Sequence, residues 1–288
     1  MAKKSNMDMR IIEEKIFKAL MLFSLGTVMA ALLVIVGVVF IKGIASLTVD
    51  IVTKTPEAGY YLGGGGGILN AIMGSLYLAG GATIMAFFAS IAVAAYLQSD
   101  FSDKGMAETI RTVLDILWGV PSIIYGVFCF TFMVYLGIGT SLLAGMIALT
   151  MLEIPIMTRS MDEALRAVPK DMKEASYSLG ATRTETALLV ARGQALPGMM
   201  SGVLLALGRG IGDAASILFT AGFSDHVPTS LMDSAAALPT MIFFLSTSPV
   251  GEVRDRAYAA AFILLAVVLI LSIGSKLLSR RFSRNVVK

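Results

Sequence analysis

Six stretches of this 288-residue chain carry few or no charges and are long enough to cross a lipid bilayer. About 20 apolar residues in a helix span a hydrocarbon core roughly 30 Å thick. Lipid offers no hydrogen-bond partner to an open backbone, so each stretch has to be helical. The stretches are residues 19–41, 70–97, 116–136, 138–157, 197–219 and 257–275. We therefore expect an all-α membrane protein with six transmembrane helices.

The composition agrees with this expectation and excludes other classes. Hydrophobic residues make up 56% of the chain and charged residues 15%, which is too apolar for a soluble domain. The net charge of +3 comes with basic residues clustered between the apolar stretches, which indicates topology signals rather than a nucleic-acid surface. The single cysteine, Cys129, and the single histidine, His226, form neither a disulfide framework nor a Cys/His metal site. We expect no cofactor.

Basic residues set the expected orientation in the membrane. Loops rich in Lys and Arg stay on the cytoplasmic side. Such residues gather at the N-terminus, in the connection 158–196 and in the C-terminal tail, so all three are expected inside. A chain with both ends inside (N-in, C-in) must cross the membrane an even number of times, and six spans meet this requirement. The first stretch, 19–41, is longer than the apolar region of a signal peptide and is expected to be a permanent span.

These signals divide the chain into a short leading segment, a first span and a core. We expect a cytoplasmic N-terminal segment (1–18), a first transmembrane helix (19–41), an outer loop (42–69), a core of five transmembrane helices (70–278) that includes a cytoplasmic loop (158–196) and an outer segment (220–256), and a basic cytoplasmic tail (279–288).

Two further segments need separate interpretation. Residues 234–251 are uncharged, so a seventh span is possible, but Pro239 and Pro249 interrupt them and a seventh span would export the basic tail. We expect a re-entrant or surface segment that is either covered by protein or lies at the outer interface. The five glycines at 63–67 lack a following Gly-Lys-Ser/Thr, so they are no phosphate loop, and a flexible start of the second span is expected.

The fifth stretch contains two charges. Arg209 lies twelve residues after Pro197, about 18 Å along a helix and therefore near the bilayer centre. A central arginine costs roughly 2.5–3.5 kcal/mol in lipid, so it should face protein, water or an anion. Asp213 lies one turn further on the same face. Asp213 can pair with Arg209 or with a basic group of a partner subunit. The ion pair either locks helix packing or serves as a gate or relay site for an anionic substrate.

Other residues of the spans are expected to have structural roles. Small residues at every fourth position from Gly198 to Ala214 predict close packing against another helix. Pro121 is expected to kink the third span. Asp115 and Glu153 are expected near cytoplasmic helix ends, where solvation is cheap, and receive no functional assignment.

The sequence of the cytoplasmic loop predicts two short helices separated by a break. Pro169 is expected at the start of a helix and Gly180 at a helix C-terminal cap. Within it, Glu174, Ala175 and Ser176 are followed by Gly180 in a pattern similar to the EAA loop of ATP-binding-cassette (ABC) importer permeases. In that family the loop docks into a cleft of the ATPase subunit. The EAA pattern alone identifies only the superfamily.

Further motifs narrow the resemblance to permease subunits of phosphate importers. They are G-V-P-S-I-I-Y-G at 119–126, E-A-L-R-A-V-P at 163–169, L-G-A-T-R at 179–183 and A-L-G-R-G-I-G-D at 206–213. L-F-T-A at 218–221 is similar to the PstA-type subunit, and the resemblance covers roughly residues 65 to 275.

The resemblance implies the type I ABC-importer permease fold and a non-catalytic subunit of the inner membrane, surrounded by lipid and without a nucleic-acid partner. It implies a pathway for inorganic phosphate that includes Arg209 and Asp213 and is shared with a PstC-type sister permease. It also implies coupling to a PstB-type ATPase dimer through the four loop residues, and delivery of substrate by a PstS-type external binding protein.

Three positions depart from the family pattern: Ser176 replaces the usual second alanine, Arg192-Gly193 stands where Leu-Pro is common, and Asp213 replaces a common glutamate.

Other functions of the chain stay open. A permease for sulfate, molybdate or tungstate would share the loop. A self-sufficient secondary transporter would need inverted repeats, which we do not see. A membrane enzyme would need more acid–base or nucleophilic groups than this pair provides.

Overall fold

The computed structural model describes residues 2–98 and 103–283, which are almost entirely helical. The expected tail 279–288 lies within the described residues only up to residue 283. The long helices are α1 (Ala2–Ser46), α3 (Leu69–Tyr96), α4 (Lys104–Trp118), α5 (Ser122–Leu136), α6 (Leu142–Arg166), α9 (Arg192–Ile211) and α11 (Gly251–Ser283). The short helices are α2 (Val49–Thr53), α7 (Lys170–Ser178), α8 (Arg183–Glu185) and α10 (Leu238–Ser246).

Five helical stretches within residues 2–98 and 103–283 are long and apolar enough to cross a membrane, and α4 with α5 makes a sixth if the pair counts as one span. The all-α prediction is therefore confirmed. The expected break in the third span does fall at Pro121, but the single span expected at 116–136 is instead two helices, α4 and α5, whose axes differ by 96°. Pro121 lies between the two helices with a ψ of 135°, and it has no backbone N–H to donate to a helical hydrogen bond.

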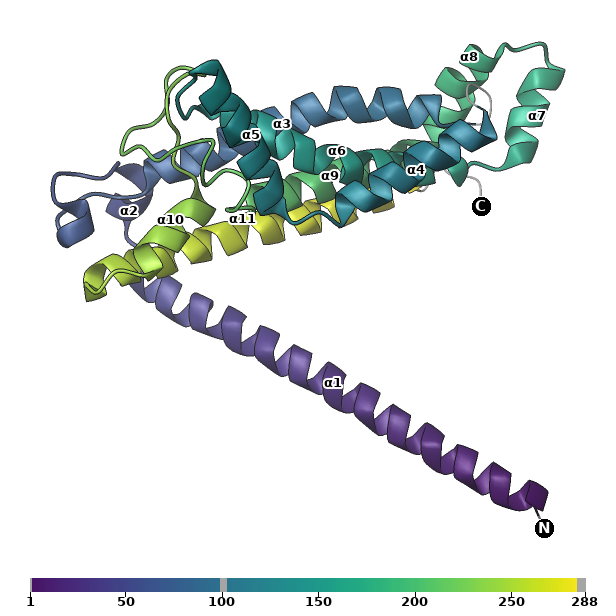
Figure 1. Ribbon diagram of the computed structural model, residues 1–288, viewed down its shortest axis with the longest axis horizontal. Helices are drawn as coiled ribbons and strands as arrows, with labels where there is room; N and C mark the ends of the chain where they lie inside the picture. Colours follow the sequence, from purple (N-terminus) through teal and green to yellow (C-terminus); the bar gives the residue numbers. More distant parts are fainter. Residues whose placement is uncertain (1, 99–102, 284–288) are drawn as a thin grey trace.

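Figure 1 shows α3, α4, α6, α9 and α11 running side by side, while α1 leaves this bundle at an angle. The start of α1, α7 and the end of α11 lie toward the same end of the molecule, as the expected topology requires. Helix α1 contacts α11 near its own C-terminus, where Lys42 Nζ lies 4.7 Å from the ring centre of Tyr258. Most of its apolar side chains are exposed, which suits a helix that faces lipid or another chain.

Helix α6 is the central element of the bundle and is buried along most of its length. The fourth span was expected to start at residue 138, but α6 starts at Leu142. Ser141 caps the helix, because its Oγ accepts a hydrogen bond from Ala144 N (3.3 Å). Its other end continues to Arg166, so the expected loop 158–196 begins with two helical turns. Gly145 packs against Leu78 of α3, which brings these two helices into close contact.

The fifth span also differs from the expected continuous helix at 197–219. The helix extends from Arg183, through a π-helical segment at Thr186–Ala191, to Ile211 and ends there. The chain then continues in turns that bury Ser216, Ile217 and Thr220. Irregular backbone at membrane depth is tolerated because protein covers it.

The outer loop is ordered around Arg256, so the expected flexible glycine segment at 63–67 is wrong. The Arg256 guanidinium donates to the carbonyl oxygens of Tyr60 (2.7 Å) and Gly64, and lies 4.2 Å from the Tyr60 ring centre. Burial raises the pKa of Tyr60 to about 12. Gly66 has a φ of 110° and pairs with Pro56 in an antiparallel bridge. A glycine is needed there because the left-handed region strains other residues.

The segment 234–251 contains α10, whose nine residues are too few to cross a bilayer. Its first residues are buried, and Leu238 N donates to Ser75 Oγ of α3 at 2.7 Å. The helix also packs on α11, in a cluster that includes Met241, Leu245 and Val253. Protein therefore covers residues 235–241 of this segment, whereas Phe243 and Phe244 are exposed. Helix α10 lies against α3 and α11 at the end of the bundle opposite α7.

Candidate functional site

Helix α9 packs antiparallel on α6 through the predicted stripe of small residues. Gly198 faces Ala164, Gly202 faces Ser160 and Gly210 faces Glu153. A Cβ on Gly198 would lie 2.6 Å from that of Ala164, and one on Gly202 would lie 2.5 Å from that of Ser160. Only glycine permits this approach, so the interpretation of the stripe as a packing seam is confirmed.

This register places Arg209 and Asp213 about halfway along α6, at the point where α9 ends. Arg209 Nη1 lies 3.0 Å from Asp213 Oδ1. The two side chains differ in exposure, with 47% of Arg209 and 4% of Asp213 accessible. The other oxygen, Asp213 Oδ2, accepts hydrogen bonds from Ser216 N (2.9 Å) and Ser216 Oγ (2.6 Å).

The two charges of this pair are held differently. Asp213 caps the turn that follows the end of α9, because its carboxylate satisfies a backbone N–H as an N-cap residue does. Arg209 has Asp213 as its one partner among residues 2–98 and 103–283. A guanidinium carries five N–H donors, so most of those of Arg209 stay available on its exposed side. The arrangement can present a hydrogen-bonding cation to an anion without disturbing Asp213.

Glu153 lies at the same depth and is completely buried, so its expected solvated position near a cytoplasmic helix end is wrong. Thr83 Oγ1 of α3 donates to Glu153 Oε2 at 2.9 Å, while Oε1 packs on Gly210 and has no hydrogen-bond partner within the described chain. Hydropathy could not reveal this burial, because one carboxyl among apolar residues gives no indication of which neighbouring helix it faces.

Helix α7 contains Glu174 and Ala175, and both are exposed. None of its residues is buried, and Leu179, directly after it, is 90% exposed. Gly180 ends the helix with a φ of 87°, and Ala181 N donates to Ser176 O at 3.2 Å, so the predicted C-terminal cap is confirmed. A solvated helix with an apolar residue at its end is suited to docking against another protein.

The loop is tied to the start of the fifth span at two points. The Ser176 and Thr186 hydroxyl groups lie 2.9 Å apart, which gives the serine that replaces alanine a structural contact. Thr182 and Glu185 form a capping box, in which Thr182 N donates to Glu185 Oε2 at 2.8 Å. Glu185 lies in the loop 158–196 that is expected outside the membrane, and the hydrogen bonds that it accepts from Thr182 N and Thr182 Oγ1 lower its pKa. The loop and α9 therefore form one connected unit.

A buried ion-pair cluster that the sequence did not indicate joins α4 to α6. Asp162 is fully buried and accepts from Arg111 Nε (2.7 Å) and Nη2 (3.0 Å), and Arg159 Nη1 lies 3.5 Å away. Arg159 also pairs with Asp115 at 2.7 Å. The spacing of Arg159 and Asp162 on one helix was the only available signal, since Arg111 belongs to a distant part of the chain.

Residues 86–286 match the model of the family described as "Binding-protein-dependent transport system inner membrane component". The chain is 31% identical over 278 residues to the phosphate transport system permease protein PstA of Haemophilus influenzae, covering 95% of this chain and 98% of the relative. It is 31% identical to PstA of Yersinia pestis, covering 90% and 88%. It is also 29% identical to the probable ABC transporter permease protein YqgI of Bacillus subtilis, covering 87% and 90%.

Solved structures share the fold. A chain of the MetNI methionine ABC transporter in an inward-facing conformation superimposes with a TM-score of 0.61 at 19% identity, covering 75% of this chain and 95% of that one. A chain of the bacterial alginate ABC transporter gives 0.62 at 15% identity, covering 95% and 99%. The chain therefore belongs to the binding-protein-dependent transport system inner membrane components, as a multi-pass ABC-importer permease of the inner membrane that groups with the PstA-type subunits.

Proposed function

We propose that this chain is one permease half of an ATP-driven importer of inorganic phosphate. The other half is a PstC-type permease, a PstB-type ATPase dimer supplies the energy, and a PstS-type binding protein delivers phosphate from outside. The chain itself is non-catalytic. The observation that carries the phosphate assignment is the match to PstA proteins along 95% of the chain, rather than in one shared loop.

The geometry of Arg209 supports a role in the substrate pathway. The residue lies at mid-depth, where an irregular backbone follows the end of α9, and it is about half exposed. Arginine matches the oxygens of a phosphate with paired N–H donors. Asp213 is held by Ser216, so Arg209 can turn from Asp213 toward an arriving anion while the carboxylate stays in place. The pair then acts as a gate that an anion opens by competing for the guanidinium.

The loop geometry supports coupling through Glu174, Ala175, Ser176 and Gly180. Glu174 and Ala175 face solvent on α7, while the contact between the Ser176 and Thr186 hydroxyl groups connects α7 to the helix that contains Arg209. A displacement of α7 by the ATPase subunits is therefore transmitted to the fifth span as a rigid-body shift. The ATPases must hold α7 differently in their two nucleotide states, because only differential contacts move an equilibrium.

Uptake in proteoliposomes tests this proposal. Vesicles that contain this chain, its neighbouring permease and the ATPase are supplied with the binding protein and labelled phosphate, with and without ATP inside. We expect ATP-dependent uptake that is lost when any component is omitted. Unlabelled sulfate, molybdate and tungstate serve as competitors, and competition by one of these in preference to phosphate would reassign the substrate. Uptake by this chain alone, driven by an ion gradient, would contradict the importer assignment.

A further inference from the structure

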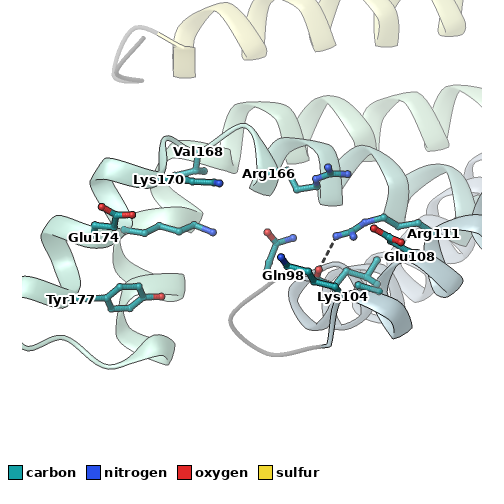
Figure 2. Close-up of a pocket in the computed structure, with 12 residues that line it drawn as sticks. Gln98, Lys104, Glu108, Arg111, Arg166, Val168, Lys170, Glu174 and Tyr177 are labelled. Carbon is teal, nitrogen blue, oxygen red and sulfur yellow. Dashed lines mark hydrogen bonds between the residues drawn. The ribbon is translucent and has the colours of Figure 1, made fainter.

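A pocket of about 460 Å³ lies between helix α7 and the cytoplasmic end of the bundle. Helix α7 belongs to the loop 158–196, which we call the coupling loop. Its walls come from the end of α3, the first turns of α4, the end of α6 and helix α7. In Figure 2, Gln98, Lys104 and Arg111 line one side of the pocket, and Lys170, Glu174 and Tyr177 line the other. The pocket thus lies between the element that would meet the ATPase and the helices that cross the membrane.

Positive charge predominates in this pocket. Lys104, Arg166, Lys170 and Lys173 line it together with two carboxylates, Glu108 and Glu174. No described residue forms a hydrogen bond or ion pair with Lys104, Arg166 or Lys170. Like charges that converge on one concavity repel each other, and an anion bound between them would relieve that repulsion.

One wall of the pocket is fixed before any ligand arrives. Arg111 is held by the buried carboxylate of Asp162 and also donates from Nη2 to Leu97 O at 2.7 Å. Leu97, Ala107 and Val168 are buried and form an apolar floor. The cluster therefore differs from a solvated row of lysines, because its cations come from three elements around a shaped concavity.

We propose that this pocket binds the phosphate group of a cytoplasmic anion, which is either the headgroup of an anionic phospholipid or free inorganic phosphate. Basic pockets between membrane helices on the cytoplasmic side attract phospholipid headgroups, and lysine and arginine donors bind both phosphate species. The bound group would link Lys104 of α4 to Lys170 of α7 and so limit how far the coupling loop moves from the bundle. The binding itself does not depend on the proposed transport of phosphate.

Hydrogen exchange on the purified full-length chain tests this site. The chain is kept in an uncharged detergent and titrated with inorganic phosphate, and in a second arm it is placed in phosphatidylcholine nanodiscs with or without phosphatidylglycerol. The test variant carries Lys104→Gln, Arg166→Gln and Lys170→Gln. The matched control loses the same charge at exposed positions elsewhere through Lys15→Gln, Lys18→Gln and Lys276→Gln. The test variant and the control are each measured again with Arg209→Gln added. This substitution removes the cation of the proposed transport pathway, so that phosphate bound at Arg209 can be distinguished from phosphate bound in the pocket.

We expect exchange at α7 and the start of α4 to slow in the unaltered chain and in the control, with the half-saturating concentration raised at least about ten-fold in the test variant. Protection by phosphate in detergent identifies free phosphate as the ligand. Protection only with phosphatidylglycerol identifies the lipid headgroup. Equal protection of the test variant and the control, or no protection in either arm, overturns the site. Protection that disappears with Arg209→Gln also overturns it, because the signal then comes from the pathway.

Discussion

Gly210 of α9 packs directly on the carboxyl group of Glu153 in α6, at the depth where α9 ends. A methyl group at this position would overlap Glu153 Oε1, so the fully buried carboxyl group would have to shift. We expect Gly210→Ala to destabilise the folded chain by about 1–3 kcal/mol, as overpacking does. Thermal unfolding of the chain in detergent, followed by size-exclusion chromatography, measures the change.

The matched control for this substitution is Gly193→Ala, because Gly193 lies in the same helix and has open space around its Cα. Alanine there should leave stability unchanged or raise it slightly, since alanine favours helix over glycine. Equal effects of the two variants would contradict close packing between α9 and α6 at Glu153.

Arg209→Gln should reduce phosphate uptake about ten- to a hundred-fold without dissociating the complex, because it removes a charged donor but leaves the Asp213–Ser216 hydrogen bonds in place. Uptake in proteoliposomes and co-purification of the subunits are both measured. Arg254→Gln, at an exposed arginine of α11, is the control. Normal uptake by Arg209→Gln would mean that the pair only stabilises packing.

Glu174→Lys and Gly180→Trp should uncouple ATP hydrolysis from uptake while the chain still inserts into the membrane. Glu174 is exposed, so the fold tolerates its reversal, whereas Gly180 adopts a φ of 87° that strains any other residue. The ratio of phosphate imported to ATP hydrolysed is the measurement. Glu14→Lys makes the same charge change on α1 and should leave this ratio unaltered. Normal coupling in the two loop variants would remove the loop from the mechanism.

The presence of the spans, though not the break between α4 and α5, could be predicted from the sequence because each span is a local property, namely a run of apolar residues of sufficient length. The glycine stripe from Gly198 to Gly210 could be predicted for the same reason. The position of Glu153 could not, because its burial depends on which helices meet around it. The order of the outer loop was missed because Arg256 reaches it from α11, far away in the sequence.

The end of α9 at Ile211 was also beyond prediction from the sequence. Residues 212–219 continue a largely apolar pattern, and no proline interrupts them. The helix ends because Asp213 binds Ser216 and because protein covers the turns that follow, so that the irregular backbone stays out of lipid. This break determines how Arg209 is presented, although the composition of the stretch gives no sign of it.

Asp162→Asn should lower the stability of the folded chain by about 3 kcal/mol, since it leaves Arg111 and Arg159 without the buried charge between them. The double variant Arg111→Gln with Asp162→Asn should recover part of this loss, and a double-mutant cycle of thermal unfolding measures the coupling. Asp50→Asn breaks a pair that is exposed on both sides and should cost less than about 1 kcal/mol. Strict additivity of the Arg111 and Asp162 variants would contradict a shared ion pair.

Acid should loosen the capping box that joins the coupling loop to the fifth span. The hydrogen bonds from Thr182 lower the pKa of Glu185 below its ordinary value of 4.5. A carboxyl whose pKa is lowered by folding stabilises the fold above its unfolded pKa, and this contribution is lost as the pH falls through the lowered folded value. We expect exchange at residues 182–186 to be slow and constant near neutral pH and to accelerate below about pH 4, after correction for the intrinsic exchange rate. Glu185→Gln keeps an acceptor but cannot titrate, so its protection should not change over this range. An identical acid response in the Gln variant would show that another group controls the loop.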